Sequence, residues 1–144
     1  MTIAIGNDHA GTAYKNAILE ALENQGFSTV NYGTNDEKSV DYPDFVHPVA
    51  QSVANNKSNF GILICGSGNG VSMTANKYPN VRAALCWNTE IAQLARSHNN
   101  ANILSLPARF TNIKESLDIV KTFLSTEFEG GRHERRVKKI DKND

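Results

Sequence analysis

Residues 60–70 are the stretch that most limits what this chain can fold into. They read FGILICGSGNG, and the apolar run at 62–64 is typical of a strand buried on both faces of a parallel sheet. The run ends at Cys65, glycines follow at 66, 68 and 70, and a helical pattern covers 71–77. The stretch therefore predicts a strand, a glycine-rich turn and the start of a helix, a corner whose backbone amides can approach an anion.

Cys65 lies at the mouth of this corner. A helix N-terminus can lower a thiol pKa from about 8.5 to roughly 3.5–7.5, which would make Cys65 a base or nucleophile near neutral pH. The alternative is that Cys65 is a small core residue, as most free cysteines are. This stretch alone leaves both interpretations open.

Three named phosphate or nucleotide motifs do not fit the loop. A phosphate-loop NTPase needs a lysine directly after the glycines, and the first lysine is Lys77. A dinucleotide fingerprint needs a third glycine at position 71, which is Val71, and an acidic residue about 20 residues further on. A cysteine phosphatase would need an arginine in the loop. What remains is an anion-stabilising loop with a thiol beside it.

Strand and helix patterns alternate along the rest of the chain. We expect strands at 2–6, 28–32, 62–64, 81–86 and 103–106, and helices at 13–25, 43–55, 71–77, 89–98, after Asn112, and at 132–140. This alternation predicts an α/β fold with a five-stranded parallel sheet, helices on both faces and strand order 2-1-3-4-5. We predict a single domain over residues 1–144, with residues 129–144 as a C-terminal helical tail.

Composition excludes several classes of protein. Fifteen basic and fifteen acidic side chains cancel, so no overall field favours nucleic acid or an anionic membrane. No apolar run approaches the roughly 20 residues of a membrane span, and the first residues lack a signal sequence. The two cysteines form no CxxC pair, so neither a disulfide framework nor zinc spacing is present. We expect a soluble, cytoplasmic protein.

Two chemically suggestive loops should face each other at one edge of the sheet. Ligands of doubly wound sheets bind outside the carboxyl ends of the strands, where the strand order reverses. Asp8 and His9 follow the first strand, and Cys65 follows the third. Asp8 could instead be a helix N-cap, and His98, at the end of a helix, could be there only because the helix dipole favours it.

The C-terminal tail offers candidate anion ligands. Arg132 and Arg136 are four residues apart, so they share a helix face and could grip one phosphate, although a solvated basic face is the alternative. Arg109 follows the fifth strand and is a third candidate. His133 has no second metal ligand nearby in this interpretation, so we predict no metal site and no cofactor.

Six motifs together resemble the ribose-5-phosphate isomerase type B family over essentially the whole chain. They are GNDHAG at 6–11, DYP at 41–43, ICGSGNG at 64–70, ANK at 75–77, HNNAN at 98–102 and EGGRHERR at 129–136. The resemblance implies a Rossmann-like three-layer sandwich and a metal-free aldose–ketose isomerase that interconverts ribose 5-phosphate and ribulose 5-phosphate through an enediolate. It also implies a homodimer, or a dimer of such dimers, whose sites and whose 129–144 tail lie at the interface.

The resemblance also assigns roles to residues. Cys65 would be the base, His98 would help open the furanose ring, and Asp8 would bind the sugar and shuttle a hydroxyl proton. The enediolate oxygens would be held by the loop, namely Gly66, Ser67, Gly68, Asn69 and Gly70. Asn99 would contact the sugar, and the sugar or phosphate ligands would be His9, Arg109, Arg132 and Arg136.

The sequence departs from the family pattern at few positions. Asn7 stands where Cys or Ser is common, and Val71 stands where one subgroup carries a glutamate base, so the chain resembles the cysteine-dependent subgroup. Galactose-6-phosphate isomerase subunits share several motifs, so a six-carbon substrate such as allose or galactose 6-phosphate is an alternative. A non-catalytic nucleotide- or flavin-binding module is another.

Overall fold

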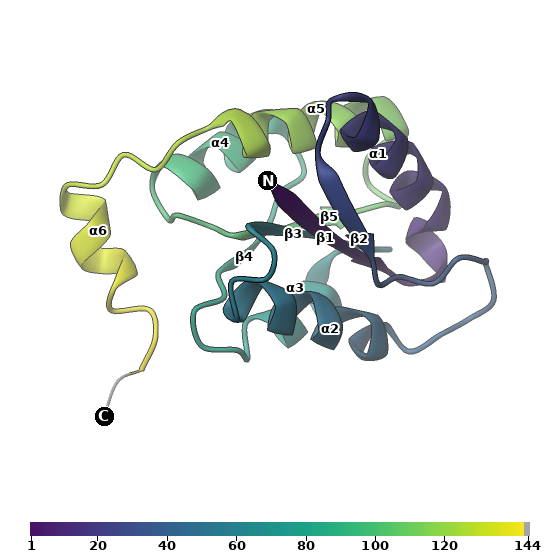
Figure 1. The fold of residues 1–144 in the computed structure, drawn as a ribbon, viewed down its shortest axis with the longest axis horizontal. Coiled ribbons are helices and arrows are strands. Elements are labelled where there is room, and N and C mark those ends of the chain that lie inside the picture. The colour runs from purple at the N-terminus through teal and green to yellow at the C-terminus, as the bar shows by residue number, and fades with distance from the viewer. Residues whose placement is uncertain (143–144) are drawn as a thin grey trace.

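A five-stranded parallel sheet lies between two layers of helices in the computed structural model, which describes residues 1–142 (Figure 1). The strands are β1 (Thr2–Asn7), β2 (Ser28–Asn31), β3 (Phe60–Cys65), β4 (Ala83–Leu85) and β5 (Ile103–Pro107). The helices are η1 (His9–Gly11, a 3-10 turn), α1 (Thr12–Asn24), α2 (Tyr42–Ala54), α3 (Asn69–Ala75), α4 (Thr89–Ser97), α5 (Ile113–Ser125) and α6 (Arg132–Val137). The predicted α/β class is confirmed; positions 143–144 of the predicted tail lie outside the described residues.

The order of the strands corrects one prediction. The sheet runs β2-β1-β3-β5-β4, so the last two strands are exchanged relative to the predicted 2-1-3-4-5. All five residues of β5 are buried, which suits an interior strand, whereas β4 has three half-buried residues, as expected at an edge. The exchange leaves β1 and β3 adjacent, so the predicted meeting of their carboxyl ends holds.

Each face of the sheet has its own apolar core. Helices α1, α4 and α5 cover one face, with Ile18, Ala92 and Phe123 among the residues packed on the strands. Helices α2 and α3 cover the other, with Val49 and Val71 inward. No helix within residues 1–142 is both long and apolar enough to cross a lipid bilayer.

Helix α6 stands apart from both layers in Figure 1 and buries none of its residues. The segment before it is held by the amide of Glu129, which donates to the carbonyl of Ser97 at 3.0 Å, and the segment after it by Asp141, which accepts from the amide of Asn80 at 3.0 Å. Its position thus depends on a few polar contacts rather than on a packed core.

Lys15 is a fully buried cation on α1. Its ammonium donates to the Thr34 carbonyl at 2.5 Å and to Asn35 Oδ1 at 2.6 Å, and burial lowers its pKa below the ordinary value. Asn7 donates to the same Thr34 carbonyl at 3.2 Å. These bonds hold the loop after β2 against α1 and against Asn7, the residue before Asp8.

Arg96 holds the turn between α4 and β5. Its guanidinium donates to the Ala101 carbonyl at 2.6 Å, to Asn100 Oδ1 at 3.0 Å and to the Thr126 carbonyl at 3.2 Å. It also lies over the ring of Phe60, 4.8 Å from the centroid. Burial, and then the charge of Arg82, lower the pKa of Arg96. One side chain therefore fixes the backbone on which His98 and Asn99 stand.

We expect Arg96→Met to destabilise the protein by at least about 2 kcal/mol, because each buried acceptor left unpaired costs about 1–3 kcal/mol. Arg96→Lys should recover little of this, since a lysine lacks the planar fork that reaches three acceptors. Urea unfolding measures the loss. The matched control is Lys121→Met, an exposed cation on α5; a loss in Arg96→Met no larger than in this control would contradict the assignment.

Candidate active site

Cys65 ends β3 at the start of the glycine loop. Its side chain is 5% exposed, and the Gly68 amide donates to Sγ at 3.1 Å. Gly68 has φ +76°, a left-handed conformation that glycine adopts without strain, and it caps the short helix α3. Sγ also borders the core formed with Val71 and Ala75. The burial of Cys65 agrees with the interpretation of a small core residue, and the contact from Gly68 leaves the role of a base as a prediction.

The loop after Cys65 leaves several amides free. The amides of Gly66, Ser67 and Gly70 donate to no group within residues 1–142, whereas the Asn69 amide donates to Ser67 Oγ at 3.3 Å. The loop carbonyls are held from the other side, because the amides of Ala108 and Arg109 donate to Cys65 and Gly66. The loop is thus anchored through its carbonyls and presents N–H groups that an anionic oxygen can use.

Asp8 and His9 lie on the neighbouring loop, as the sequence predicts. The Asp8 amide donates to the Ile64 carbonyl at 3.1 Å, which places the two loops side by side. One carboxylate oxygen of Asp8 accepts from the Ala10 amide at 2.9 Å, so the N-cap interpretation is confirmed for that oxygen. His9 Nδ1 accepts from the Val40 amide at 3.3 Å.

Arg109 and Tyr42 complete the surroundings of the glycine loop. The Arg109 side chain lies against Gly66, where a Cβ atom would come within 3.1 Å of its guanidinium nitrogen. Tyr42 lies over Gly70, where a Cβ would come within 2.4 Å of the ring. Arg109 was predicted; Tyr42 was noted only within a motif, because its distance along the chain from Gly70 gives no pattern that links them.

The remaining predicted residues gather elsewhere. An open hollow of about 410 Å³ is lined by His98, Asn99, Arg132 and Arg136, together with His133, Val137 and Ile140. The turn that carries Asn99 leads into the amino end of β5, where the Asn102 carbonyl accepts from the Gly61 amide at 2.9 Å. Gly61 and Cys65 are four residues apart on β3, about 13 Å at the usual rise of a strand. Within one chain the loop after Cys65 and the hollow beside His98 therefore lie at opposite ends of the strands.

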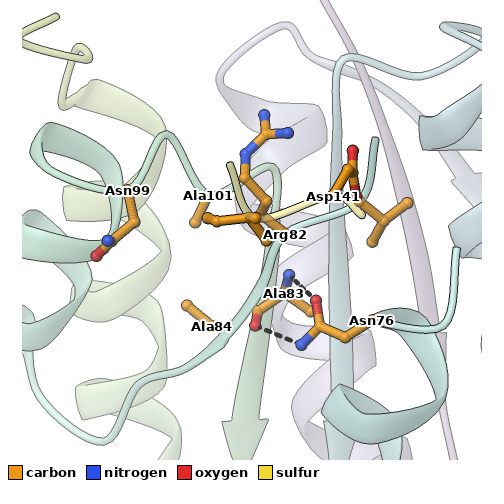
Figure 2. Close-up of a pocket in the computed structure, with 9 residues that line it drawn as sticks. Asn76, Arg82, Ala83, Ala84, Asn99, Ala101 and Asp141 are labelled. Carbon is orange, nitrogen blue, oxygen red and sulfur yellow. Dashed lines mark hydrogen bonds between the residues drawn. The ribbon is translucent and has the colours of Figure 1, made fainter. Parts of the chain in front are cut away.

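A second hollow of about 380 Å³ lies beside edge strand β4 (Figure 2). Figure 2 shows Asn76 bonded twice to Ala83: its Nδ2 donates to the Ala83 carbonyl at 3.0 Å, and its Oδ1 accepts from the Ala83 amide at 2.8 Å. Asn99 and Ile140 also line this hollow. An amide side chain thus satisfies backbone groups of β4 that an edge strand leaves unpaired.

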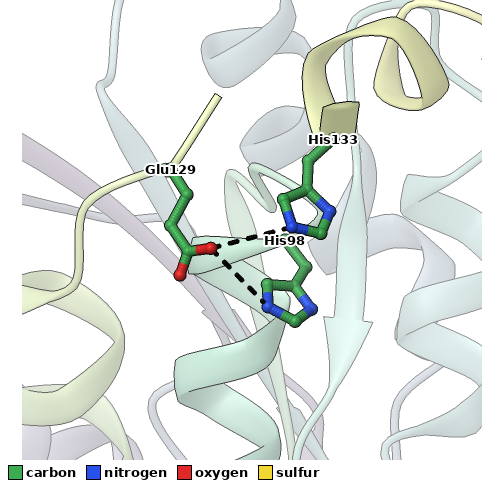
Figure 3. A group of neighbouring side chains, drawn as sticks. All are labelled: His98, Glu129 and His133. Carbon is green, nitrogen blue, oxygen red and sulfur yellow. Dashed lines mark ion pairs between the residues drawn. The ribbon is translucent and has the colours of Figure 1, made fainter. Parts of the chain in front are cut away.

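His98, Glu129 and His133 form a cluster that the sequence did not predict (Figure 3). His98 Nε2 lies 3.8 Å and His133 Nε2 3.7 Å from the same oxygen, Glu129 Oε1, and the two rings stack with centroids 4.2 Å apart. The prediction that His133 has no second metal ligand nearby is therefore wrong, because the turn after α5 folds Glu129 back onto the end of α4. Desolvation, followed by the positive charges of His98, Arg132 and Arg136, lowers the pKa of His133, while Glu129 raises it.

The other cysteine, Cys86, and the remaining histidine, His47, make contacts away from the glycine loop. Cys86 is fully buried, and burial raises its pKa to about 12, so its thiol stays protonated. His47 Nδ1 and the Tyr78 hydroxyl form a hydrogen bond at 2.6 Å. Cys65 is therefore the thiol with a donor beside it.

Comparison with known proteins gives a consistent result. The sequence profile described as Ribose/Galactose Isomerase matches residues 3–140. A ribose 5-phosphate isomerase from Thermotoga maritima is 51% identical and superposes with a TM-score of 0.95 over 97% of both chains. Ribose-5-phosphate isomerase B from Mycoplasma genitalium, whose crystal structure holds bound ribulose-5-phosphate, is 47% identical with a TM-score of 0.93, covering 96% of this chain and 93% of that one. Ribose-5-phosphate isomerase B from Escherichia coli K12 is 39% identical over 96% of this chain and 93% of its own.

We expect Glu129→Gln to lower the pKa of His133 further, because the Glu129 carboxylate is the nearby group that raises it. NMR titration of the histidine ring signals measures the change. Glu134→Gln is the matched control: the Glu134 carboxylate pairs with Lys138 at 3.3 Å and does not act on His133, so the pKa should stay in place. An unchanged or raised His133 pKa in Glu129→Gln would count against the cluster.

Proposed function

Because the chain belongs to the Ribose/Galactose Isomerase family, we propose that it is an aldose–ketose isomerase that interconverts ribose 5-phosphate and ribulose 5-phosphate. The observation that carries the proposal is the Cys65 thiol, 3.1 Å from the Gly68 amide and followed by free loop amides. A base and a set of oxyanion donors are the two things that proton abstraction next to a carbonyl requires.

In this mechanism the Cys65 thiolate removes the C2 proton of the open-chain aldose. The electron pair moves toward the carbonyl, and the resulting enediolate carries its charge on O1 and O2. The same sulfur returns the proton to C1, while Asp8 moves the hydroxyl proton between O2 and O1. General acid–base catalysis of this kind is typically worth about 10²–10⁴-fold.

The glycine loop stabilises the enediolate. The free amides of Gly66, Ser67 and Gly70 supply donors that need no rearrangement when charge develops, and each such donor is worth about 2.7–4 kcal/mol. The Ser67 hydroxyl and the backbone of Gly68 and Asn69 line the same turn. The Gly68 amide donates to the Cys65 sulfur at 3.1 Å, which fixes the position of that sulfur beside the free amides.

The second group of residues opens and holds the sugar. His98 acts as the acid–base group that opens the furanose ring, and Asn99 contacts the sugar hydroxyls. Arg132 and Arg136 grip the phosphate, with His9 and Arg109 on the opposite side. Charge-assisted bonds from paired guanidinium groups suit a phosphate, and their binding energy orients the reacting carbons. The proposed mechanism uses no cofactor.

One site needs both groups, so we propose a homodimer in which each site takes Cys65 and Asp8 from one chain and His98, Arg132 and Arg136 from the other. The placement of these groups at opposite edges of one chain supports it. Helix α6 buries none of its residues, which suits a tail packed against a partner. A two-fold axis then makes two identical sites from one contact.

The family description names galactose as well as ribose isomerases, so a six-carbon sugar phosphate is the second candidate substrate. Turnover of allose or galactose 6-phosphate without turnover of ribose 5-phosphate would replace the proposal. A cytoplasmic location belongs to the same proposal, since a thiol that acts as a base must stay reduced.

We expect Cys65→Ala to reduce kcat for ribose 5-phosphate by at least about 10²-fold, the lower range for loss of an acid–base group. Cys86→Ala is the matched control, because it removes a buried thiol with a raised pKa and should keep most of the activity. A coupled assay of ribulose 5-phosphate formation measures both. Equal rates in Cys65→Ala and the native protein would remove the proposed base.

Mixing two inactive variants tests the shared site. In a dimer of one Cys65→Ala chain and one His98→Asn chain, one site carries both changes and the other carries neither. Random mixing of inactive partners should therefore restore about a quarter of the native activity if the sites are shared across a two-fold axis. Sites made within one chain would leave every mixture inactive.

A further inference from the structure

The cluster of His98, Glu129 and His133 has the composition of a transition-metal site. Two imidazoles and a carboxylate are a donor set found in zinc enzymes, where a fourth position takes water. The two histidine nitrogens lie 3.8 and 3.7 Å from Glu129 Oε1, and all three ligand atoms lie within 4.8 Å of one another. Ligand atoms on tetrahedral zinc, with bonds of about 2.0–2.2 Å, are about 3.3–3.5 Å apart. The carboxylate is thus within a few tenths of an ångström of such a site.

The three ligand atoms have no competing partners. None of them forms a hydrogen bond with another group in residues 1–142, and distances of 3.7 and 3.8 Å are too long for hydrogen bonds within the cluster. Figure 3 shows both rings presenting a nitrogen to the same carboxylate oxygen. Within the described residues the three ligand atoms are therefore free of other partners, and both ring nitrogens lie near the same carboxylate oxygen.

From this arrangement we propose that His98, Glu129 and His133 bind a zinc ion, and that zinc in this site inhibits the isomerase. The inhibitory half rests on the proposed function, because it uses His98 as the group that opens the sugar ring. A metal on His98 Nε2 occupies the lone pair with which that ring would accept a proton. Binding of metal and ring opening thus exclude each other.

Formation of the site requires the two rings to change their relative orientation. The rings now stack with 12° between their planes, and a metal in the plane of both needs them to splay apart. Within one chain, the side chains of His98 and Glu129 are 39% and 58% exposed, so other groups of that chain leave room for them to rotate, while His133 is 12% exposed and stays in place. Figure 3 shows His98 at the end of α4, whereas Glu129 precedes α6 and His133 lies on it, so the metal would tie the start of α6 to the end of α4.

The donor set also selects the metal. Imidazole and carboxylate suit zinc, whereas magnesium prefers a nearly complete set of oxygen ligands. Arg132 and Arg136 line the same hollow, and their positive charges weaken cation binding. They also favour an anion, hydroxide or chloride, as the fourth ligand. We therefore expect reversible zinc binding that a chelator removes.

Binding is tested on the full protein with cobalt as a spectroscopic probe and zinc by calorimetry. Native protein should give the visible bands of tetrahedral cobalt without a thiolate-to-metal charge-transfer band, and zinc should displace the cobalt. Glu129→Gln and His133→Asn should each weaken binding by at least about tenfold, since even an outer-shell partner is worth about 10–100-fold. His47→Asn, which removes a histidine far from the cluster, should bind as the native protein does.

Several outcomes would overturn the site. They are absence of metal binding by the native protein, a thiolate band that assigns the metal to Cys65 or Cys86, and unchanged affinity in both cluster variants. The two variants lie four residues apart, and circular dichroism checks that each is folded. Because these readouts need no turnover, they hold even if the protein proves inactive on ribose 5-phosphate.

Inhibition is measured separately, with each variant compared to its own metal-free rate. Zinc should inhibit the native enzyme, EDTA should restore the rate, and His133→Asn should require at least about tenfold more zinc. Zinc bound at the cluster without loss of activity would overturn the competition with His98.

Discussion

The carboxyl end of β3 is the constraint on which the rest of the structure depends. This strand is buried between β1 and β5, so the chain must leave the sheet in a space bounded by two neighbouring loops. The amides of Ala108 and Arg109, which follow β5, donate to the carbonyls of Cys65 and Gly66. The Asp8 amide donates to the carbonyl of Ile64. With its carbonyls occupied, the loop turns its remaining N–H groups outward. The Cys65 thiol therefore lies beside free backbone amides, and the proposed chemistry depends on this arrangement.

Charge is arranged separately from that loop. In the proposed mechanism the phosphate ligands Arg132 and Arg136 stand on α6, which buries none of its residues. Arg96, which is buried, holds the turn that carries His98 and Asn99 beside them. A protein without net charge can still bind an anion tightly, because the cations are gathered on one surface and balanced elsewhere.

Local sequence predicted what local physics determines. The buried strand, the glycine loop and the amphipathic helices all follow from patterns within a dozen residues. The exchange of β4 and β5 does not, because strand order depends on how helices cross the sheet. Lys15 was missed for a similar reason: its burial depends on Thr34 and Asn35, which a distant loop supplies. Glu129 and His133 contact His98 only because the chain folds back after α5 toward the end of α4. No residue spacing in the sequence predicts this fold.

The doubly bonded side chain of Asn76 bears on how wide the sheet can grow. Its side-chain amide makes the two hydrogen bonds with the Ala83 backbone that a sixth strand would otherwise make. An extended peptide from another molecule would have to displace the Asn76 side chain before it could pair with β4. One side-chain amide thus occupies the free hydrogen-bonding groups of Ala83, and this protects edge strand β4 from pairing with a strand of another molecule.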